Sequence, residues 1–162
     1  MSGPNDVVIY TDGACTGNPG PGGYGVVLLC DGKRKELSAG YRRTTNNRME
    51  IMAAIAGLRA LNSPCTVTLY TDSRYLADAI TKGWAVNWRK RGWQRSDGQP
   101  ALNPDLWQIL LDLLAVQRVT FVWVRGHAGN EENERCDQLS VAAAHSAHLL
   151  IDDGYENKQL PE

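Results

Sequence analysis

Three strand-like segments follow one another at the start of the chain, before any segment with helical periodicity appears. They cover residues 7–11, 24–30 and 36–43, and the first two are rich in β-branched and large apolar side chains. The Asn18–Gly23 run and Asp31-Gly32 supply the turns between them. Such short connections leave no room for a crossover helix. The opening of the chain therefore predicts a three-stranded antiparallel meander.

The period of the sequence changes at about residue 46. Ile51, Ala54, Ile55 and Leu58 mark one face of a helix over 46–61, which Asn62-Ser63-Pro64 ends. Strand-like and helical segments then alternate, with strands over 66–71 and 119–124 and helices over 73–82, from 103 or 105 to about 115, and over 131–147. A meander followed by this alternation predicts an α/β fold, with a mixed five-stranded sheet and helices on both faces.

Size and composition suit one domain over residues 1–162, with a core of about 6–147. No apolar run approaches the ~20 residues of a membrane helix, and Met1 to Asp6 does not open a signal peptide. Cys15, Cys30, Cys65 and Cys136 are widely spaced, which indicates reduced thiols and a cytoplasmic protein. We expect a monomer, and a short polar tail (about 149–162) that is loosely held.

Two strands share one ending. Tyr10-Thr11-Asp12 and Tyr70-Thr71-Asp72 each close a predicted strand with an aspartate. If these strands are adjacent and parallel, both carboxylates emerge at the same carboxyl-terminal edge of the sheet, where α/β folds place their sites. Glu50 lies in the first turns of the first helix, and Asp137 lies nearly two turns into the last one.

Converging carboxylates repel one another, and a hard divalent cation relieves that repulsion. Oxygen-only ligands favour Mg²⁺, with Mn²⁺ as a substitute, over zinc. Four carboxylates fit two ions about 3.5–4 Å apart better than one. Taken singly, each acid also suits an ordinary helix cap or a first-turn position that complements the helix dipole. Spacing alone leaves both interpretations open.

Long motifs around these acids resemble those of bacterial type 1 ribonuclease H. They cover Ile9–Gly25, Thr44–Glu50, Thr71–Ser73, Trp123–Gly129 and Asn133–Asp137, in the family's order. The resemblance implies the ribonuclease H-like fold and two-metal hydrolysis of the RNA strand of RNA–DNA hybrids, leaving 5′-phosphate and 3′-hydroxyl ends. It makes Asp12, Glu50, Asp72 and Asp137 the catalytic metal ligands, with Asp12 bridging both ions.

His127 lies between Gly126 and Ala128-Gly129. Its near-neutral pKa range suits proton transfer, and glycine neighbours give the backbone freedom. The resemblance implies a role in proton handling or product release. For His145 and His148 we expect ordinary solvated side chains.

A basic and aromatic segment lies between Asp78 and Asp97, an interval without any acid. Basic side chains contact phosphates, and aromatic rings pack on sugars or bases. The alternative is an amphipathic helix with buried tryptophans and a solvated basic face, and both descriptions can hold together. The resemblance implies that this segment contacts the DNA strand. The residues that we single out for binding nucleic acid are Trp84, Trp88, Arg89, Lys90 and Arg91.

Recognition of RNA requires donors and acceptors near its 2′-hydroxyl groups. By resemblance, Cys15, Asn18, Asn46 and Asn47 face the minor groove, and Thr45 belongs to a pocket for a DNA phosphate. Turn formation or helix capping explains any one of the asparagines equally well.

Arg74 departs from the family pattern, because the best-known bacterial relatives carry Gln after Asp-Ser. Gln both donates and accepts hydrogen bonds, whereas Arg only donates. Arg74 is therefore expected to contact phosphate in place of a hydroxyl or base edge.

Two rival functions remain at this point. One is a nuclease of the same fold that acts on DNA, since fold alone does not fix the substrate. The other is a catalytically silent module that binds hybrid. The basic and aromatic segment argues against the first, and the complete set of four acids argues against the second.

Overall fold

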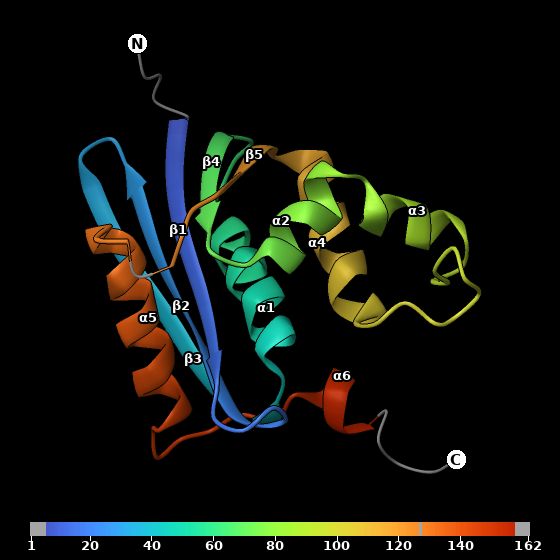
Figure 1. The fold of residues 1–162 in the computed structure, drawn as a ribbon. Coiled ribbons are helices and arrows are strands. Elements are labelled where there is room, and N and C mark those ends of the chain that lie inside the picture. The colour runs from blue at the N-terminus through green and yellow to red at the C-terminus, as the bar shows by residue number, and fades with distance from the viewer. Residues whose placement is uncertain (1–5, 127, 158–162) are drawn as a thin grey trace.

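The computed structural model describes residues 6–126 and 128–157 (Figure 1). The strands are β1 (Asp6–Cys15), β2 (Gly20–Cys30), β3 (Lys33–Thr44), β4 (Thr66–Thr71) and β5 (Arg118–Trp123). The helices are α1 (Asn46–Arg59), α2 (Arg74–Thr81), α3 (Trp84–Lys90), α4 (Pro104–Val116), α5 (Glu131–Ala144) and α6 (Asp153–Glu156). In these two ranges, no helix has the length and apolar character needed to cross a membrane.

The five strands form one mixed sheet in the order β3-β2-β1-β4-β5. β1, β2 and β3 pair antiparallel, whereas β4 and β5 run parallel to β1. The hairpin between β2 and β3 turns through Asp31 and Gly32, whose φ angles of 54° and 75° match the type of turn that fits the twist of the flanking strands. The predicted meander and five-stranded mixed sheet are confirmed.

Helices cover both faces of the sheet, as predicted (Figure 1). α1 packs on one face against β1 and β2, and α5 packs on the opposite face against β2, β1 and β3. The close approach of α5 depends on glycines in β2. A side chain on Gly25 would collide with the backbone carbonyl of Cys136, and one on Gly23 with that of Ser140. β2 begins at Gly20, whereas the glycine-rich sequence predicted a turn up to Gly23. These glycines therefore lie within the strand, where two of them make room for α5.

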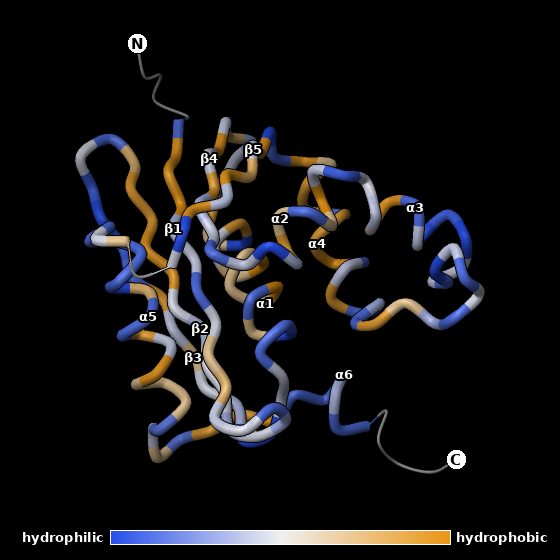
Figure 2. Tube along the Cα trace, in the orientation of Figure 1, coloured by the Kyte–Doolittle hydropathy of each residue, from blue (hydrophilic) through white to orange (hydrophobic). Residues whose placement is uncertain are grey.

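The segment from α2 to α4 extends the layer on the α1 side, and α3 lies at its outer end (Figure 1). Trp107 on α4 is fully buried, and its indole Nε1 donates to the hydroxyl of Tyr75 at 3.3 Å. Trp88 packs against Trp107, with ring centroids 6.1 Å apart. The loop directly after α3 is largely hydrophilic, as Figure 2 shows. The apolar side of α3 is thus fixed to the core, and its basic side faces outward.

The described residues after α5, up to residue 157, make specific contacts with β3 and α1, whereas the sequence predicted a loosely held tail from about residue 149. Leu150 bridges to Tyr41 of β3, and its backbone N–H donates to the carbonyl of Gly40 at 2.8 Å. Asp152 is only 2% exposed and accepts hydrogen bonds from Arg48 of α1 and from the hydroxyl of Thr44. The composition of this segment did not predict its attachment, because the buried carboxylate of Asp152 and the backbone of Leu150, rather than an apolar run, hold it.

Candidate active site

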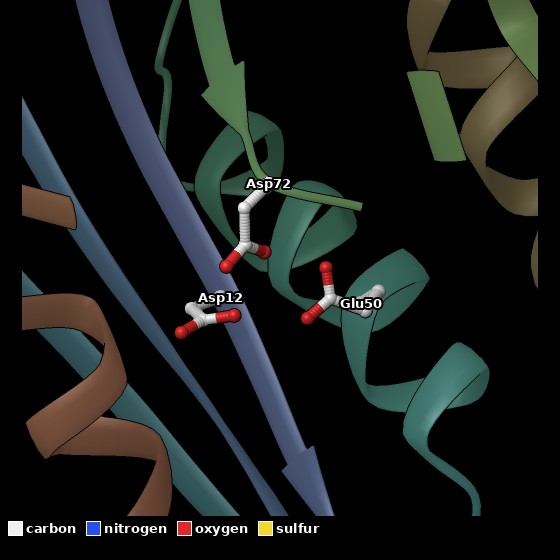
Figure 3. A group of neighbouring side chains, drawn as sticks. All are labelled: Asp12, Glu50 and Asp72. Atoms are coloured by element: carbon white, nitrogen blue, oxygen red, sulfur yellow. The ribbon is translucent and has the colours of Figure 1, made fainter. Parts of the chain in front are cut away.

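Three carboxylates converge beside β1 (Figure 3). Asp12 comes from β1, Asp72 from the residue after β4, and Glu50 from α1. Oxygen atoms of the three lie within 4.8 Å of one another. The parallel register of β1 and β4 pairs Tyr10 with Tyr70, so the two aspartates each follow two residues later. The shared Tyr-Thr-Asp ending therefore reflects adjacent strands, as the sequence suggested.

Gly13 brings α1 and β1 together at this point. Its backbone N–H donates to Asp12 Oδ1 at 2.9 Å and to Glu50 Oε1 at 2.6 Å. A Cβ atom on Gly13 would lie 2.6 Å from the backbone nitrogen of Glu50. Only glycine permits this close approach of β1 to α1. The approach places the carboxylates of Asp12 and Glu50 side by side on the N–H of Gly13.

The electrostatics of the cluster disfavour three simultaneous charges. The pKa of Asp12 is raised to about 7, chiefly by burial; the charges of Asp72 and Asp137 add to the rise, and hydrogen bonds oppose it. Burial also raises the pKa of Glu50, and the neighbouring charge of Asp12 adds to this effect. Glu50 Oε2 is buried without a hydrogen-bond partner. An oxygen of this kind is costly to bury unless a cation completes its coordination.

Asp137 approaches the cluster from the opposite side, on α5. The thiol of Cys136 donates to the carbonyl of Tyr10 at 3.2 Å, which anchors α5 to β1 next to Asp137. Its carboxylate is near enough to raise the pKa of Asp12, but it is not among the three that lie within 4.8 Å of one another. The predicted fourth ligand thus faces the site at a greater distance. His127, the predicted proton-transfer residue, lies outside the described residues.

The first group of predicted binding residues surrounds the start of α1. Asn18 Oδ1 accepts from the backbone N–H of Asn46 at 3.0 Å, and the hydroxyl of Thr45 caps the helix by accepting from the N–H of Arg48. The half-buried Cys15 thiol donates to backbone carbonyls, including that of Thr44. Asn46 is exposed and Asn47 half-buried. The turn and capping roles are therefore real, and they also hold these side chains together on one surface.

The second group lies on α3, away from the acids. Trp84 is 39% exposed, whereas Trp88 is half-buried between Trp84 and Trp107. Trp88 therefore packs against its neighbours, as the amphipathic-helix interpretation predicts, and contact of the surface residue Trp84 with nucleic acid stays a prediction. Arg89 pairs with Asp112 at 3.1 Å, and Lys90 and Arg91 are exposed. A hollow of about 280 Å³ beside these residues is lined by Trp84, Asn87, Trp88, Arg91, Arg95, Ser96 and Asp97.

Two residues near the site escaped the sequence analysis. Arg48, which lies two residues before Glu50 in the first turn of α1, is 1% exposed and pairs with both Asp105 and Asp152. Trp123 donates through its indole Nε1 to the backbone carbonyl of Asp72 at 3.0 Å. Arg48 and Trp123 both lie inside the family motifs. Their partners are distant in sequence, so the motifs alone do not reveal their roles.

The raised pKa of Asp12 predicts how metal affects stability. In the folded, metal-free protein this carboxyl titrates near pH 7, against about 4 in the unfolded chain. Between these values the folded state binds more protons, so its stability falls as the pH rises through that window. Mg²⁺ at millimolar concentration should therefore raise the melting temperature strongly at pH 8 and little at pH 5. Thermal melts in Mg²⁺ and in EDTA test this, and an equal shift at both pH values would contradict it.

Comparison with known proteins agrees with this geometry. A family model for RNase H matches residues 4–145. The chain is 66% identical over 149 residues to Ribonuclease H from Syntrophus aciditrophicus, covering 92% of this chain and 86% of that protein. It is 62% identical over 155 residues to Ribonuclease H from Rippkaea orientalis, covering 96% and 95%.

Among solved structures, LC9-RNase H1, described as a type 1 RNase H with the type 2 active-site motif, superimposes with a TM-score of 0.77 at 34% identity. The match covers 99% of this chain and 83% of that one. These likenesses confirm the resemblance drawn from the sequence motifs, and the fold predicted with it. The chain belongs to the RNase H family.

Proposed function

We propose that the acidic cluster beside β1 is where this chain hydrolyses the RNA strand of RNA–DNA hybrids. Membership of the RNase H family makes the chain an endonuclease for RNA paired to DNA, with a metal-dependent reaction. The observation that carries the assignment is the convergence of Asp12, Glu50 and Asp72 within 4.8 Å. Asp137 completes the set from α5.

The residues present fit divalent metal ions. Glu50 Oε2 is buried and unpartnered, and burial and mutual repulsion raise the pKa values of Asp12 and Glu50. All the available ligands are carboxylate oxygens, which suit Mg²⁺ and also Mn²⁺. We assign Mg²⁺ to the site, and two ions because four carboxylates exceed what one hydrated Mg²⁺ takes up.

Bound ions supply an activated water and stabilise the leaving oxygen. The protein's own contribution is the preorganised frame. The N–H of Gly13 holds Asp12 and Glu50 in one orientation, and adjacent parallel strands hold Asp12 beside Asp72. Because these groups are fixed before substrate binds, little reorganisation accompanies the reaction. We assign proton handling to His127, and 5′-phosphate and 3′-hydroxyl ends to the products.

Selection of a hybrid requires contacts on both strands. We assign Cys15, Asn18, Asn46 and Asn47 to the minor groove, where 2′-hydroxyls mark RNA. Thr45 and the exposed side of α3, with Trp84, Arg89, Lys90 and Arg91, contact the DNA strand. With a net charge of −1, the chain depends on such local basic surfaces to bind a polyanion.

We further propose that the protein acts as a monomer in the cytoplasm. The four cysteines are widely spaced in the sequence and form no CxxC pair, which supports a reducing compartment. Light scattering tests the monomer, since a dimer would give twice the mass of 17.8 kDa.

A cleavage assay with matched substrates tests the function. The protein is given end-labelled RNA–DNA hybrid, double-stranded DNA and double-stranded RNA of one sequence, each with Mg²⁺ or with EDTA. We expect cleavage of the hybrid only, in the RNA strand only, and only with Mg²⁺. Cleavage of the DNA duplex would favour a DNA nuclease of the same fold. Binding of hybrid without cleavage would favour a silent binding module, and either result would contradict the proposal.

A further inference from the structure

Trp123 makes two contacts that join the acidic cluster to an exposed arginine. Its indole N–H donates to the backbone carbonyl of Asp72 at 3.0 Å. The guanidinium carbon of Arg74 lies 4.0 Å from the centroid of the Trp123 ring. One side chain thus contacts both the backbone of a candidate metal ligand and the residue two positions after it.

The fold fixes Trp123 in this position. It is the last residue of β5 and pairs with Thr71 of β4 in the parallel register. The next residue, Val124, donates its backbone N–H to the carbonyl of Thr71 at 2.9 Å. The chain after β5 then passes close to the same aspartate, because a Cβ atom on Gly126 would lie 2.8 Å from Asp72 Oδ2. Asp72 is therefore enclosed between the indole N–H and the backbone at Gly126.

The guanidinium group of Arg74 lies over the ring of Trp123, and this contact uses none of its N–H donors in a hydrogen bond. A guanidinium stacked on an aromatic ring keeps its N–H donors, which lie in the plane of the group, free for a planar anion or a phosphate. Arg74 is exposed, and none of the carboxylates in residues 6–126 and 128–157 forms an ion pair with it. Two other exposed arginines, Arg89 and Arg95, do have acidic partners, Asp112 and Asp97.

We propose that Arg74 binds a backbone phosphate of the hybrid next to Asp72, and that Trp123 is the positioning residue that sets the spacing between this phosphate contact and the metal ligand. The proposal rests on the proposed function, because it assumes that nucleic acid lies over the acidic cluster. The two contacts of Trp123 have separable effects. Its ring face acts through Arg74 on binding, and its N–H acts through Asp72 on the rate.

The phosphate contact is tested by binding in the absence of metal. The dissociation constant of labelled hybrid is measured in EDTA from about 50 to about 200 mM salt. Arg74→Ala should raise it about five- to tenfold and reduce the slope of its logarithm against the logarithm of salt by about one. Arg74→Lys should restore the slope, since it keeps the charge. Arg118→Ala is the matched control, because Arg118 is an exposed arginine at the opposite end of β5.

The positioning role is tested by Trp123→Phe, which keeps an aromatic face for Arg74 but removes the N–H. It should lower kcat about tenfold and raise the Mg²⁺ concentration needed for half-maximal activity, with the dissociation constant in EDTA unchanged. Trp123→Leu, which removes both contacts, should show this defect and the binding defect of Arg74→Ala together.

Each part has its own contradicting result. An unchanged dissociation constant and salt slope for Arg74→Ala would overturn the phosphate contact. An unchanged kcat for Trp123→Phe, or an equal loss of binding in EDTA, would overturn the positioning role. Failure of the proposed function looks different, since the unmodified protein would then fail to cleave hybrid in Mg²⁺ whatever the binding data show.

Discussion

Asp12→Asn is expected to lower the rate of hybrid cleavage about a thousandfold or more while leaving hybrid binding nearly intact. Bound metal contributes several kcal/mol of transition-state stabilisation, and about 1.4 kcal/mol corresponds to a factor of ten in rate. Asp12 lies at the centre of the cluster, next to Glu50 and Asp72. Single-turnover cleavage in Mg²⁺, together with binding of labelled hybrid in EDTA, measures the two effects separately.

The same substitution should stabilise the metal-free protein. Burial and the charges of Asp72 and Asp137 raise the pKa of Asp12 to about 7, so removing this carboxylate removes a buried charge and its repulsion, and the melting temperature in EDTA at pH 8 should rise. Loss of activity through misfolding would lower it. Asp31→Asn is the charge-matched control, because Asp31 is exposed in the β2–β3 hairpin and Asn accepts its φ of 54°. Normal cleavage by Asp12→Asn would show that the metal site is assigned to the wrong residues.

Asp152→Ala is expected to destabilise the protein by about 3 kcal/mol, because removing one partner of a buried ion pair leaves a charge uncompensated. Arg48 is 1% exposed and would keep only Asp105, whose side chain is partly exposed. The hydroxyl of Thr44 would lose its acceptor as well. For a chain of this length, such a change lowers the melting temperature by about 6–12 °C. Thermal and urea unfolding measure it.

Glu156→Ala provides the control for that experiment. Glu156 also pairs with an arginine and lies only four residues further along, but its partner Arg42 is exposed. Exposed pairs contribute about 0–1 kcal/mol, so this variant should unfold nearly like the unmodified protein. If the two variants lose equal stability, burial of the Arg48 pair has no special weight. A gain in stability for Asp152→Ala would mean that desolvation of the pair outweighs its attraction.

Much of the fold follows from local patterns. Hairpin turns, the change of period at residue 46 and the later alternation were sufficient to predict the order of the elements and the mixed sheet. The start of β2 was not predictable, because glycines that usually mark turns here let α5 lie directly on the strand at Gly23 and Gly25. The role of these glycines depends on α5, which lies more than a hundred residues later in the chain.

The candidate site likewise has features that the sequence predicts and features that it does not. The convergence of Asp12 and Asp72 was predictable from the repeated Tyr-Thr-Asp ending, because strand register carries it directly. The contribution of Gly13, whose N–H joins Asp12 to Glu50, was not, since it depends on the distance between α1 and β1. Trp123 was quoted within a motif but given no role, because its contacts with Asp72 and Arg74 exist only after β4 and β5 pair.

The ion pair between Arg48 and Asp152 also has a consequence for synthesis on the ribosome. Domains begin to fold from the amino terminus as they emerge, but here α1 needs a carboxylate that lies 104 residues further along the chain. Until then Arg48 lacks its most buried partner, and Asp137 has only recently joined the acids of β1 and α1. A chain that stops just before Asp152 therefore leaves Arg48 of α1 without this partner, even though it already carries all four acids of the candidate site.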